Sequence, residues 1–276
     1  MAITRRFFCL CLACAPAGRL DAQDAPSPAI QPARELHGLV EPSLHVAKAG
    51  SGKPPRVALT FDACSGATDR RILDVLMAEE IPATLFVTGR WLNKNAETIA
   101  LLKSRPDLFA IENHGLNHIP AVDRPGTVYG IETAGTPQAV AKEVEGGETW
   151  IAKAGFARSG WFRGATARYS ISAMTAIEAM GYRIAGYSLN GDQGATASTR
   201  AAATRVTGAR DGDVVIAHIN HPEKPAGAGI AEGLLALKRK GVTFVTLDEA
   251  AANAAASAPT PAPTPATTPA AHPAKP

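Results

Sequence analysis

The chain has 276 residues, of which 46% are hydrophobic and 19% are charged. This composition is ordinary for a globular protein and excludes a wholly disordered or fibrous chain. The formal net charge is only +3, and no basic stripe with interleaved aromatic residues occurs, so we expect no nucleic-acid partner.

The N-terminus predicts an export signal. Two arginines precede a short apolar run over residues 7–15, which is too short to span a bilayer. Ala17 and Ala22 offer cleavage sites, and Thr4-Arg5-Arg6-Phe7-Phe8 resembles a twin-arginine signal. We therefore expect a signal peptide over residues 1–22, a periplasmic or secreted protein, and no stable membrane insertion. The alternative is an apolar tail on a cytosolic protein. Removal of this segment would leave Cys64 as the single cysteine, without a disulfide partner.

Composition divides the rest of the chain into three parts. Residues 23–54 are rich in Pro and Ala and predict a linker and lead-in. Residues 251–276 are almost entirely Ala, Pro and Thr. Such a segment buries too little apolar surface to offset its conformational entropy, so we expect a disordered tail. The folded domain is therefore expected over residues 55–250.

Strand and helix patterns alternate along this domain. The expected strands are Val57–Phe61, Thr84–Thr88, Leu108–Asn113, Gly160–Arg163, Tyr182–Tyr187, Val214–His218 and Thr243–Leu247. The expected helices are Asp69–Glu80, Pro137–Ala154, Ser172–Met180 and Ile230–Lys240. Alternation of this kind indicates parallel strands joined by crossover helices. We predict an α/β fold, a distorted (β/α)7-type barrel with its active site at the carboxyl ends of the strands.

Ionisable residues end or follow five of these strands. They are Asp62, His114 with His118, Arg163, Asp192 and His218. Taken singly, each has a structural alternative: a helix cap for Asp62, an ion pair for Arg163, a core histidine for His218. His114-Gly115-Leu116-Asn117-His118 suggests a metal-binding loop, although two surface histidines are an equal alternative. Because parallel strands bring their carboxyl ends to one rim, the set predicts a shared site.

Together these residues resemble the NodB-homology polysaccharide deacetylases, carbohydrate esterase family 4. The similar motifs are, in order, Leu59-Thr60-Phe61-Asp62, Asn113-His114-Gly115-Leu116-Asn117-His118, Phe162-Arg163, Asn190-Gly191-Asp192 and Ile216-Ala217-His218. The resemblance implies a catalytic base at Asp62 oriented by Arg163, and a general acid at His218 tuned by Asp192. It also implies a divalent metal, with zinc expected, bound by His114 and His118.

The chain departs from the family pattern at Ala63, where a second, metal-binding Asp is usual. The third ligand could be Cys64, which adjoins this position, or Glu112, which is two residues before His114 on a strand, or water. Cys64 ranks last among these, because a soft thiolate donates charge to zinc and weakens its effect on a bound water. The motif after Arg163 also differs, as Gly164-Ala165-Thr166-Ala167-Arg168-Tyr169 lacks the usual prolines.

The function implied by the resemblance is removal of N-acetyl or O-acetyl groups from a cell-wall or extracellular polysaccharide, with a metal-activated water as nucleophile. The expected partner is an acetylated polysaccharide or oligosaccharide. Two alternatives remain open at this level. One is a sugar-binding module of weak catalytic activity on the same fold, which Ala63 favours. The other is a hydrolase of a small linear amide.

Overall fold

The structure is a computed structural model that describes residues 36–256. The expected signal peptide, most of the expected linker before residue 36, and residues 257–276 of the expected tail lie outside the described residues. Within 36–256, no helix combines the length and the apolar character needed to cross a membrane.

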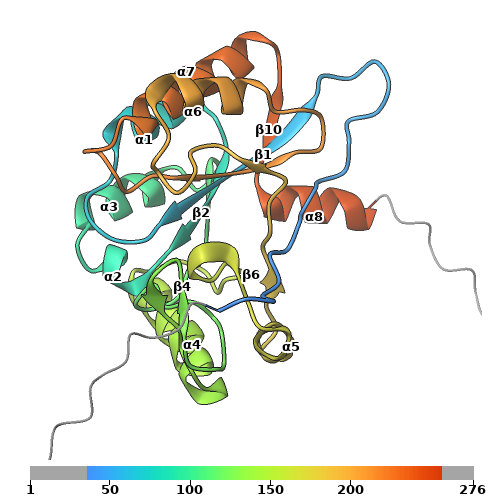
Figure 1. The fold of residues 1–276 in the computed structure, drawn as a ribbon. Coiled ribbons are helices and arrows are strands. Elements are labelled where there is room, and N and C mark those ends of the chain that lie inside the picture. Colours follow the sequence, from blue (N-terminus) through green and yellow to red (C-terminus); the bar gives the residue numbers. More distant parts are fainter. Residues whose placement is uncertain (1–35, 257–276) are drawn as a thin grey trace, which may run out of the picture. The chain divides into compact units, whose positions relative to one another are not determined.

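A mainly parallel sheet forms the centre of the fold (Figure 1). Its strands are β1 (Arg56–Ala63), β2 (Ala83–Val87), β3 (Phe109–Asn113), β6 (Trp161–Phe162), β7 (Arg183–Ile184), β8 (Leu189–Asn190), β9 (Val214–His218) and β10 (Thr243–Val245). They lie in the order β7-β6-β3-β2-β1-β9-β8, and β10 pairs with the start of β1. All strand pairs in this sheet are parallel, so the carboxyl ends share one rim. The predicted distorted barrel is confirmed.

Helices surround this sheet, most of them on its outer face. They are α1 (Arg70–Ala78), α2 (Gly89–Leu92), α3 (Ala96–Ser104), α4 (Pro137–Lys153), α5 (Ile171–Ala179), α6 (Thr199–Thr207), α7 (Ala226–Arg239) and α8 (Leu247–Ala256). Helix α8 packs instead against the apolar cluster on the inner face of the sheet. Helices α1, α6 and α7 pack together on one side, and α4 and α5 lie at the opposite end of the molecule (Figure 1). A short antiparallel hairpin, β4 (Thr127–Val128) with β5 (Ile131–Glu132), stands apart from the sheet.

Strand β1 shows how alternation separates the two sides of the sheet. Val57, Leu59 and Phe61 belong to the large apolar core beneath the helices. Ala58 belongs instead to a smaller inner cluster that includes Phe86 and Trp161. Side chains two residues apart on a strand share a face, so Asp62 follows Ala58 and points into the barrel. The same alternation assigns Cys64 to the inner face.

The seven predicted strands and four predicted helices all correspond to observed elements. The structure adds α2, α3, α6, α8, β8 and the β4–β5 hairpin, none of which was predicted. Helix α6 buries only Ala202 and Val206, and α3 buries only Thr98 and Leu102. Two buried residues one turn apart give too little periodicity to detect such helices from one sequence.

Helix α8 extends beyond the expected domain boundary at residue 250. Thr246 and Glu249 form a capping box at its start: Glu249 N donates to Thr246 Oγ1 at 3.2 Å, and Thr246 N donates to Glu249 Oε2 at 2.8 Å. Leu247 and Ala250 are buried against the inner cluster. The cap and these two contacts explain why an Ala-rich segment that composition assigned to the tail begins as a helix.

The lead-in also packs on the barrel. Strands β7 and β8 end the sheet and are not paired with each other within the described residues; we call the segment between them, residues 185–188, the seam. Tyr187 N donates to Pro42 O, and Leu44 N donates to Tyr187 O, both at 3.3 Å. A Cβ at Gly186 would lie 2.1 Å from Pro42 O, so only glycine permits this approach. The lead-in thus borders the seam.

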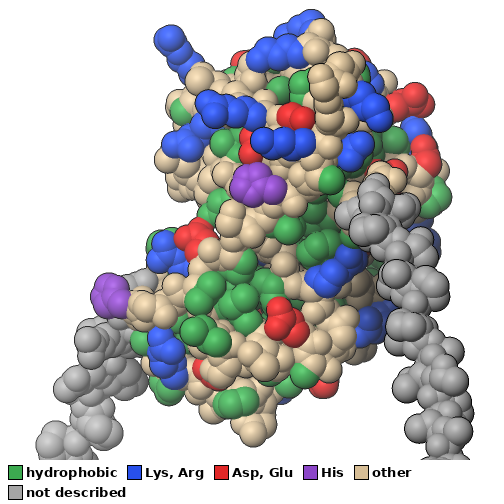
Figure 2. Space-filling view, turned by 90° about the vertical axis from the view of Figure 1, so that its right-hand side faces the viewer, with side chains coloured by type: hydrophobic (Ala, Val, Ile, Leu, Met, Phe, Trp, Pro, Cys, Tyr) green, Lys and Arg blue, Asp and Glu red, His purple; other side chains and the backbone are tan. Residues whose placement is uncertain are grey.

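One face of the molecule shows how its charges are distributed. Lys and Arg side chains lie mainly on the upper part of the face in Figure 2, and a patch of hydrophobic side chains lies lower. Asp and Glu side chains lie among them, so this face does not carry a single sign of charge.

Candidate active site

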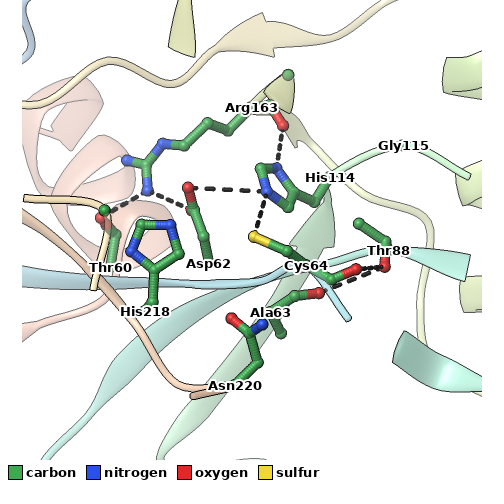
Figure 3. A network of polar contacts seen from close by, with 12 residues as sticks. Thr60, Asp62, Ala63, Cys64, Thr88, His114, Gly115, Arg163, His218 and Asn220 are labelled. Atoms are coloured by element: carbon green, nitrogen blue, oxygen red, sulfur yellow. Dashed lines mark hydrogen bonds and ion pairs between the residues drawn. The ribbon is translucent and has the colours of Figure 1, made fainter. Parts of the chain in front are cut away.

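Asp62 ends the buried part of β1 and is held by Arg163, which directly follows β6. Arg163 Nη1 donates to Asp62 Oδ1 at 3.0 Å and to Thr60 Oγ1 at 2.9 Å. Both ionised side chains are almost completely buried. In Figure 3 the guanidinium group lies on one side of the Asp62 carboxylate and His114 on the other. A buried charge needs such partners, so Asp62 has one fixed orientation.

The seam explains why Arg163 can be fully buried. Its Nε donates to Ala185 O at 3.3 Å and its Nη2 donates to Gly186 O at 2.9 Å. These two carbonyl groups belong to the segment between β7 and β8. Arg163 therefore fills the opening of the barrel and satisfies its backbone acceptors while it holds Asp62.

The pKa of Asp62 reflects the balance of these contacts. Burial raises the pKa of the carboxyl group. The positive charges of His114 and Arg163 and the hydrogen bond from Arg163 lower it by more than burial raises it, so the net pKa lies below 3.8. Asp62 is therefore a carboxylate near neutral pH, which is the form that can accept a proton.

His114 lies next to Asp62 and has a defined tautomer. Its Nδ1 is 2.5 Å from Arg163 O, and because a carbonyl oxygen only accepts, Nδ1 must carry the proton. The other nitrogen, Nε2, faces Asp62 Oδ2 at 3.8 Å and Cys64 Sγ at 3.5 Å. A backbone carbonyl that orients the remote nitrogen is the usual support for a metal-binding histidine.

Cys64, His114 and His118 form a potential metal site. Their ligand atoms all lie within 4.8 Å of one another, and the rings of the two histidines are 5.1 Å apart between centroids. Two ligand atoms on a tetrahedral zinc ion lie about 3.5 Å apart, given bond lengths of about 2.0–2.3 Å. The 3.5 Å separation of Cys64 Sγ and His114 Nε2 fits this geometry. The donor set therefore suits a divalent metal such as zinc.

The surroundings of Cys64 favour its thiolate form. Burial raises its pKa, but hydrogen bonds from His114, His118 and His218 outweigh burial, and the net pKa lies well below 9.0. The thiolate is the form that binds metals. Sequence reasoning ranked this residue last among the ligands. The usable signal was the two-residue spacing from Asp62, which assigns Cys64 to the same face of the chain.

Glu112 lies elsewhere. It shares the inner face with His114 as expected, but its Oε2 accepts a hydrogen bond from Trp161 N at 2.7 Å, and its carboxyl group contacts Asp248 at the opposite end of the barrel. It is not part of the metal-binding group. Two residues along a strand correspond to about 6.6 Å, and the side chain extends away from His114. Burial raises the pKa of Glu112 to about 8, so the group is largely neutral at pH 7.

Helix α4 fixes the loop that carries the two histidines. Glu143 Oε1 accepts hydrogen bonds from Asn117 N at 2.7 Å and Ile119 N at 3.1 Å, on either side of His118. His118 itself has a positive φ of 62°, an uncommon backbone state for a residue other than glycine. Glu143 was not identified from the sequence, because an acid inside an amphipathic helix gives no signal that distinguishes it from a surface acid.

Asp192 and His218 form a second pair. His218 is the register partner of Asp62 on the neighbouring strand, and its Nδ1 lies 3.1 Å from Asp192 Oδ2. Asp192 also accepts from His218 N at 2.6 Å. Burial lowers the pKa of His218, but the hydrogen bond and charge of Asp192 outweigh burial, and the net pKa lies well above 6.5. His218 can therefore hold a proton at neutral pH.

A cavity of about 690 Å³ opens on these groups. Asp62, Cys64, His118 and His218 all line it. The rest of its wall comes from the lead-in, the β4–β5 hairpin and the loops after β6, β7, β8 and β9, with the residues Glu41, Tyr129, Ile131, Thr166, Ala167, Tyr187, Asn190, Gln193, Gly194, Thr196 and His221 among them. All six predicted site residues thus lie together. Four line or flank the cavity, Arg163 binds Asp62, and Asp192 binds His218.

The parallel strands with reactive groups at their carboxyl ends define the class of the protein: an α/β barrel whose candidate active site lies at that end of the barrel. The polysaccharide deacetylase family model matches residues 49–185, and the chain belongs to this family. The matched residues include Asp62, His114, His118 and Arg163, whereas Asp192 and His218 lie beyond them. A search of curated proteins found no significant match.

Solved structures of the family share the fold. A family 4 acetyl xylan esterase from Clostridium thermocellum with a cobalt ion is 23% identical, with a TM-score of 0.58 over 72% of this chain and 91% of its own. The family 4 carbohydrate esterase PdaA from Bacillus subtilis is 19% identical, with a TM-score of 0.59 over 77% and 86%. A family 4 pseudoenzyme from Bacillus anthracis is 18% identical, with a TM-score of 0.56 over 72% and 66%.

Proposed function

We propose that this protein is a metal-dependent deacetylase that removes N-acetyl or O-acetyl groups from a cell-wall or extracellular polysaccharide. One observation carries the proposal: a buried carboxylate and a histidine, each fixed by its own charged partner, face one cavity beside a Cys-His-His group. A base, an acid and a metal site are the components that amide or ester hydrolysis requires.

Asp62 is the proposed base. It is ionised and it lines the cavity. Arg163, which also donates to Thr60 Oγ1, fixes its orientation from the side away from the cavity. A water molecule next to its carboxylate loses a proton to it as the water oxygen attacks the acetyl carbon. A positioned acid–base group of this kind typically contributes about 10²–10⁴-fold to the rate.

His218 is the proposed acid. Its Nδ1 is directed at Asp192, so Nε2 is the nitrogen that remains for the substrate. The attraction to Asp192 keeps the ring protonated at neutral pH, and the proton passes from His218 to the leaving amine or hydroxyl group. Asp192 is a positioning residue that does not reach the reacting atoms.

The metal site would be held by His114, His118 and Cys64. When bound, a divalent ion lowers the pKa of a coordinated water to about 7 and polarises the acetyl carbonyl group. Cys64 occupies the role that the missing carboxylate at position 63 leaves open. His114 keeps Nε2 directed at this site through its hydrogen bond to Arg163 O.

A sugar-binding module of weak catalytic activity is the second candidate. It is favoured by Ala63, which packs in the outer core at the position where the family pattern described above usually has an Asp, and by the existence of a pseudoenzyme with the same fold. The intact pairs Asp62–Arg163 and His218–Asp192 argue against it, because sugar binding alone requires no acid and base.

The test is acetate release, followed by mass detection, on fragments of peptidoglycan, chitin and poly-N-acetylglucosamine. The wild-type protein loaded with zinc should deacetylate at least one of them, and Asp62→Asn should reduce turnover by about 10²–10⁴-fold while circular dichroism and metal content remain unchanged. Turnover that survives in a folded Asp62→Asn protein would refute the assigned base. Binding of fragments without acetate release by the wild-type protein would establish the second candidate.

We also propose that the protein acts outside the cytoplasm. The supporting observation is the arginine pair followed by an apolar run and small residues at Ala17 and Ala22. Sequencing the N-terminus of the protein from a periplasmic or culture fraction should find a start near residue 18 or 23. An intact Met1 on protein that stays in the cytosol would reject export.

A further inference from the structure

We propose that Tyr129 is a stacking platform for a pyranose ring that adjoins the sugar held at Asp62, and that Glu41 and Tyr187 form the polar side of this subsite. The proposal deepens the proposed function, on which it rests for the position of the reacting sugar. It assigns the substrate class: a saccharide of at least two rings rather than a small linear amide.

The first observation is the backbone of the hairpin tip. Tyr129 and Gly130 are the two residues between β4 and β5, with φ of 51° and 75°. Two positive values define a type I′ turn, for which Asn-Gly is the preferred sequence. A bulky aromatic residue at the first position is a steric outlier. Backbone strain of this kind persists at sites where the side chain has a function.

The second observation is the position of the ring. Tyr129 is 61% exposed, and it lines the cavity that contains Asp62 and His218. Ile171 is the other exposed large hydrophobic residue in the described part of the chain, and it does not line this cavity. The Arg168 guanidinium lies over the Tyr129 ring, 4.7 Å from its centroid. The strained and exposed ring is therefore supported from one side and available to the cavity.

The third observation is the polar network beside the ring. Arg168 Nη2 binds Glu41 Oε2 at 3.3 Å, and Glu41 Oε1 accepts the hydroxyl hydrogen of Tyr187. Arg168 Nε and Thr166 Oγ1 are buried without hydrogen-bond partners, and Thr166 lines the cavity with a φ of 68°. Buried polar atoms of this kind ordinarily bind a ligand or an ordered water.

A pyranose ring fits these features. Its C–H faces are apolar and carry partial positive charge, which suits the negative face of an aromatic ring. Its hydroxyl groups need acceptors and donors around its edge, which the carboxylate of Glu41 and the groups of Tyr187 and Thr166 offer. The cavity of about 690 Å³ lies in the range of about 300–1,000 Å³ that holds drug-sized ligands, so it can hold more than one ring.

The experiment measures binding separately from catalysis. Asp62→Asn protein loaded with zinc is titrated by calorimetry with N-acetylglucosamine, its dimer and its trimer. Affinity should rise with length, and in the double variant Asp62→Asn, Tyr129→Asn the affinity for the trimer should fall about three- to tenfold. Tyr129→Phe and Ile171→Ala, each in the Asp62→Asn background, should keep the wild-type dependence on length.

Tyr129→Asn also distinguishes a ligand role from a structural one. Asn suits the type I′ turn better than Tyr, so the melting temperature should equal or exceed that of the parent. A lower melting temperature with unchanged trimer affinity would show that the ring is structural and overturn the proposal. Length-dependent affinity in a protein that releases no acetate would retain this subsite and refute the proposed catalysis. Acetate release with affinity independent of length would refute the subsite alone.

Discussion

At the residue scale, the main chemical question is which side chain completes the metal site. Cys64 Sγ lies 3.5 Å from His114 Nε2, whereas the carboxyl group of Glu112 is bound to Trp161 N. We predict that Cys64→Ser weakens zinc binding by at least tenfold, because a hydroxyl group is a much poorer zinc ligand than a thiolate. Glu112→Gln, a matched change at a buried position, should bind zinc as the wild type does. Competition with a chromogenic chelator measures both constants, and equal weakening in the two variants would contradict the assignment.

Asp192 permits a separate prediction, because its carboxylate binds both the backbone N and the ring Nδ1 of His218. Asp192→Asn removes the charge that holds the pKa of His218 above 6.5 while keeping the size of the side chain. His218 should then lose its proton at lower pH, so the alkaline limb of the kcat–pH profile should move toward acid. We expect kcat at pH 8 to fall about tenfold or more. A uniform loss of activity at all pH values, with no movement of the limb, would indicate a structural role instead.

At the scale of elements, helix α4 determines the shape of the loop that carries His114 and His118. Glu143 binds the N–H groups of Asn117 and Ile119, and Gly147 allows close approach, since a Cβ there would lie 2.3 Å from Asn113 Oδ1. We predict that Glu143→Ala lowers zinc affinity about tenfold, in the range found when supports of metal ligands are removed. Glu145→Ala, an exposed change on the same helix, is the control. Equal zinc affinity in the two variants would show that the loop holds its shape without α4.

The elements also show what one sequence can and cannot predict. Strands with continuous apolar runs, such as β1 and β9, were found close to their true limits. The two-residue spacing between Glu112 and His114 correctly assigned Glu112 to the same face as that histidine. Alternation does not give the direction of a side chain along the barrel axis. The sequence could therefore place Glu112 on the same face as His114 but could not show that its carboxylate points away from the metal-binding group. The seam was not predictable either. Arg163 binds the carbonyl groups of Ala185 and Gly186, which follow it in the sequence by 22 and 23 positions, and no local pattern reveals such a contact.

At the scale of the whole molecule, Glu112 couples stability to pH. Burial raises its pKa from 4.5 to about 8, so between these values the folded protein keeps a proton that the unfolded chain loses. Stability should therefore fall as pH rises from about 4.5 to 8 and level off above. Glu112→Gln lacks this proton, so it should be more stable than the wild type at pH 8, by a few kcal/mol at most, and similar to it at pH 5. Urea unfolding at both values measures this, and parallel pH dependence in the two proteins would contradict it.

The wall of the cavity and its floor have different origins in the chain. The floor carries Asp62, His118 and His218, whereas parts of the wall come from segments outside the quoted motifs: Glu41 from the lead-in, before the residues that the family model matches, and Gln193 and Thr196 after them. Substitutions in these flanking segments leave Asp62, Arg163 and the histidines in place. If the proposed function holds, a homologue can therefore keep the same motifs and yet accept a different glycan, because part of the cavity wall lies outside those motifs.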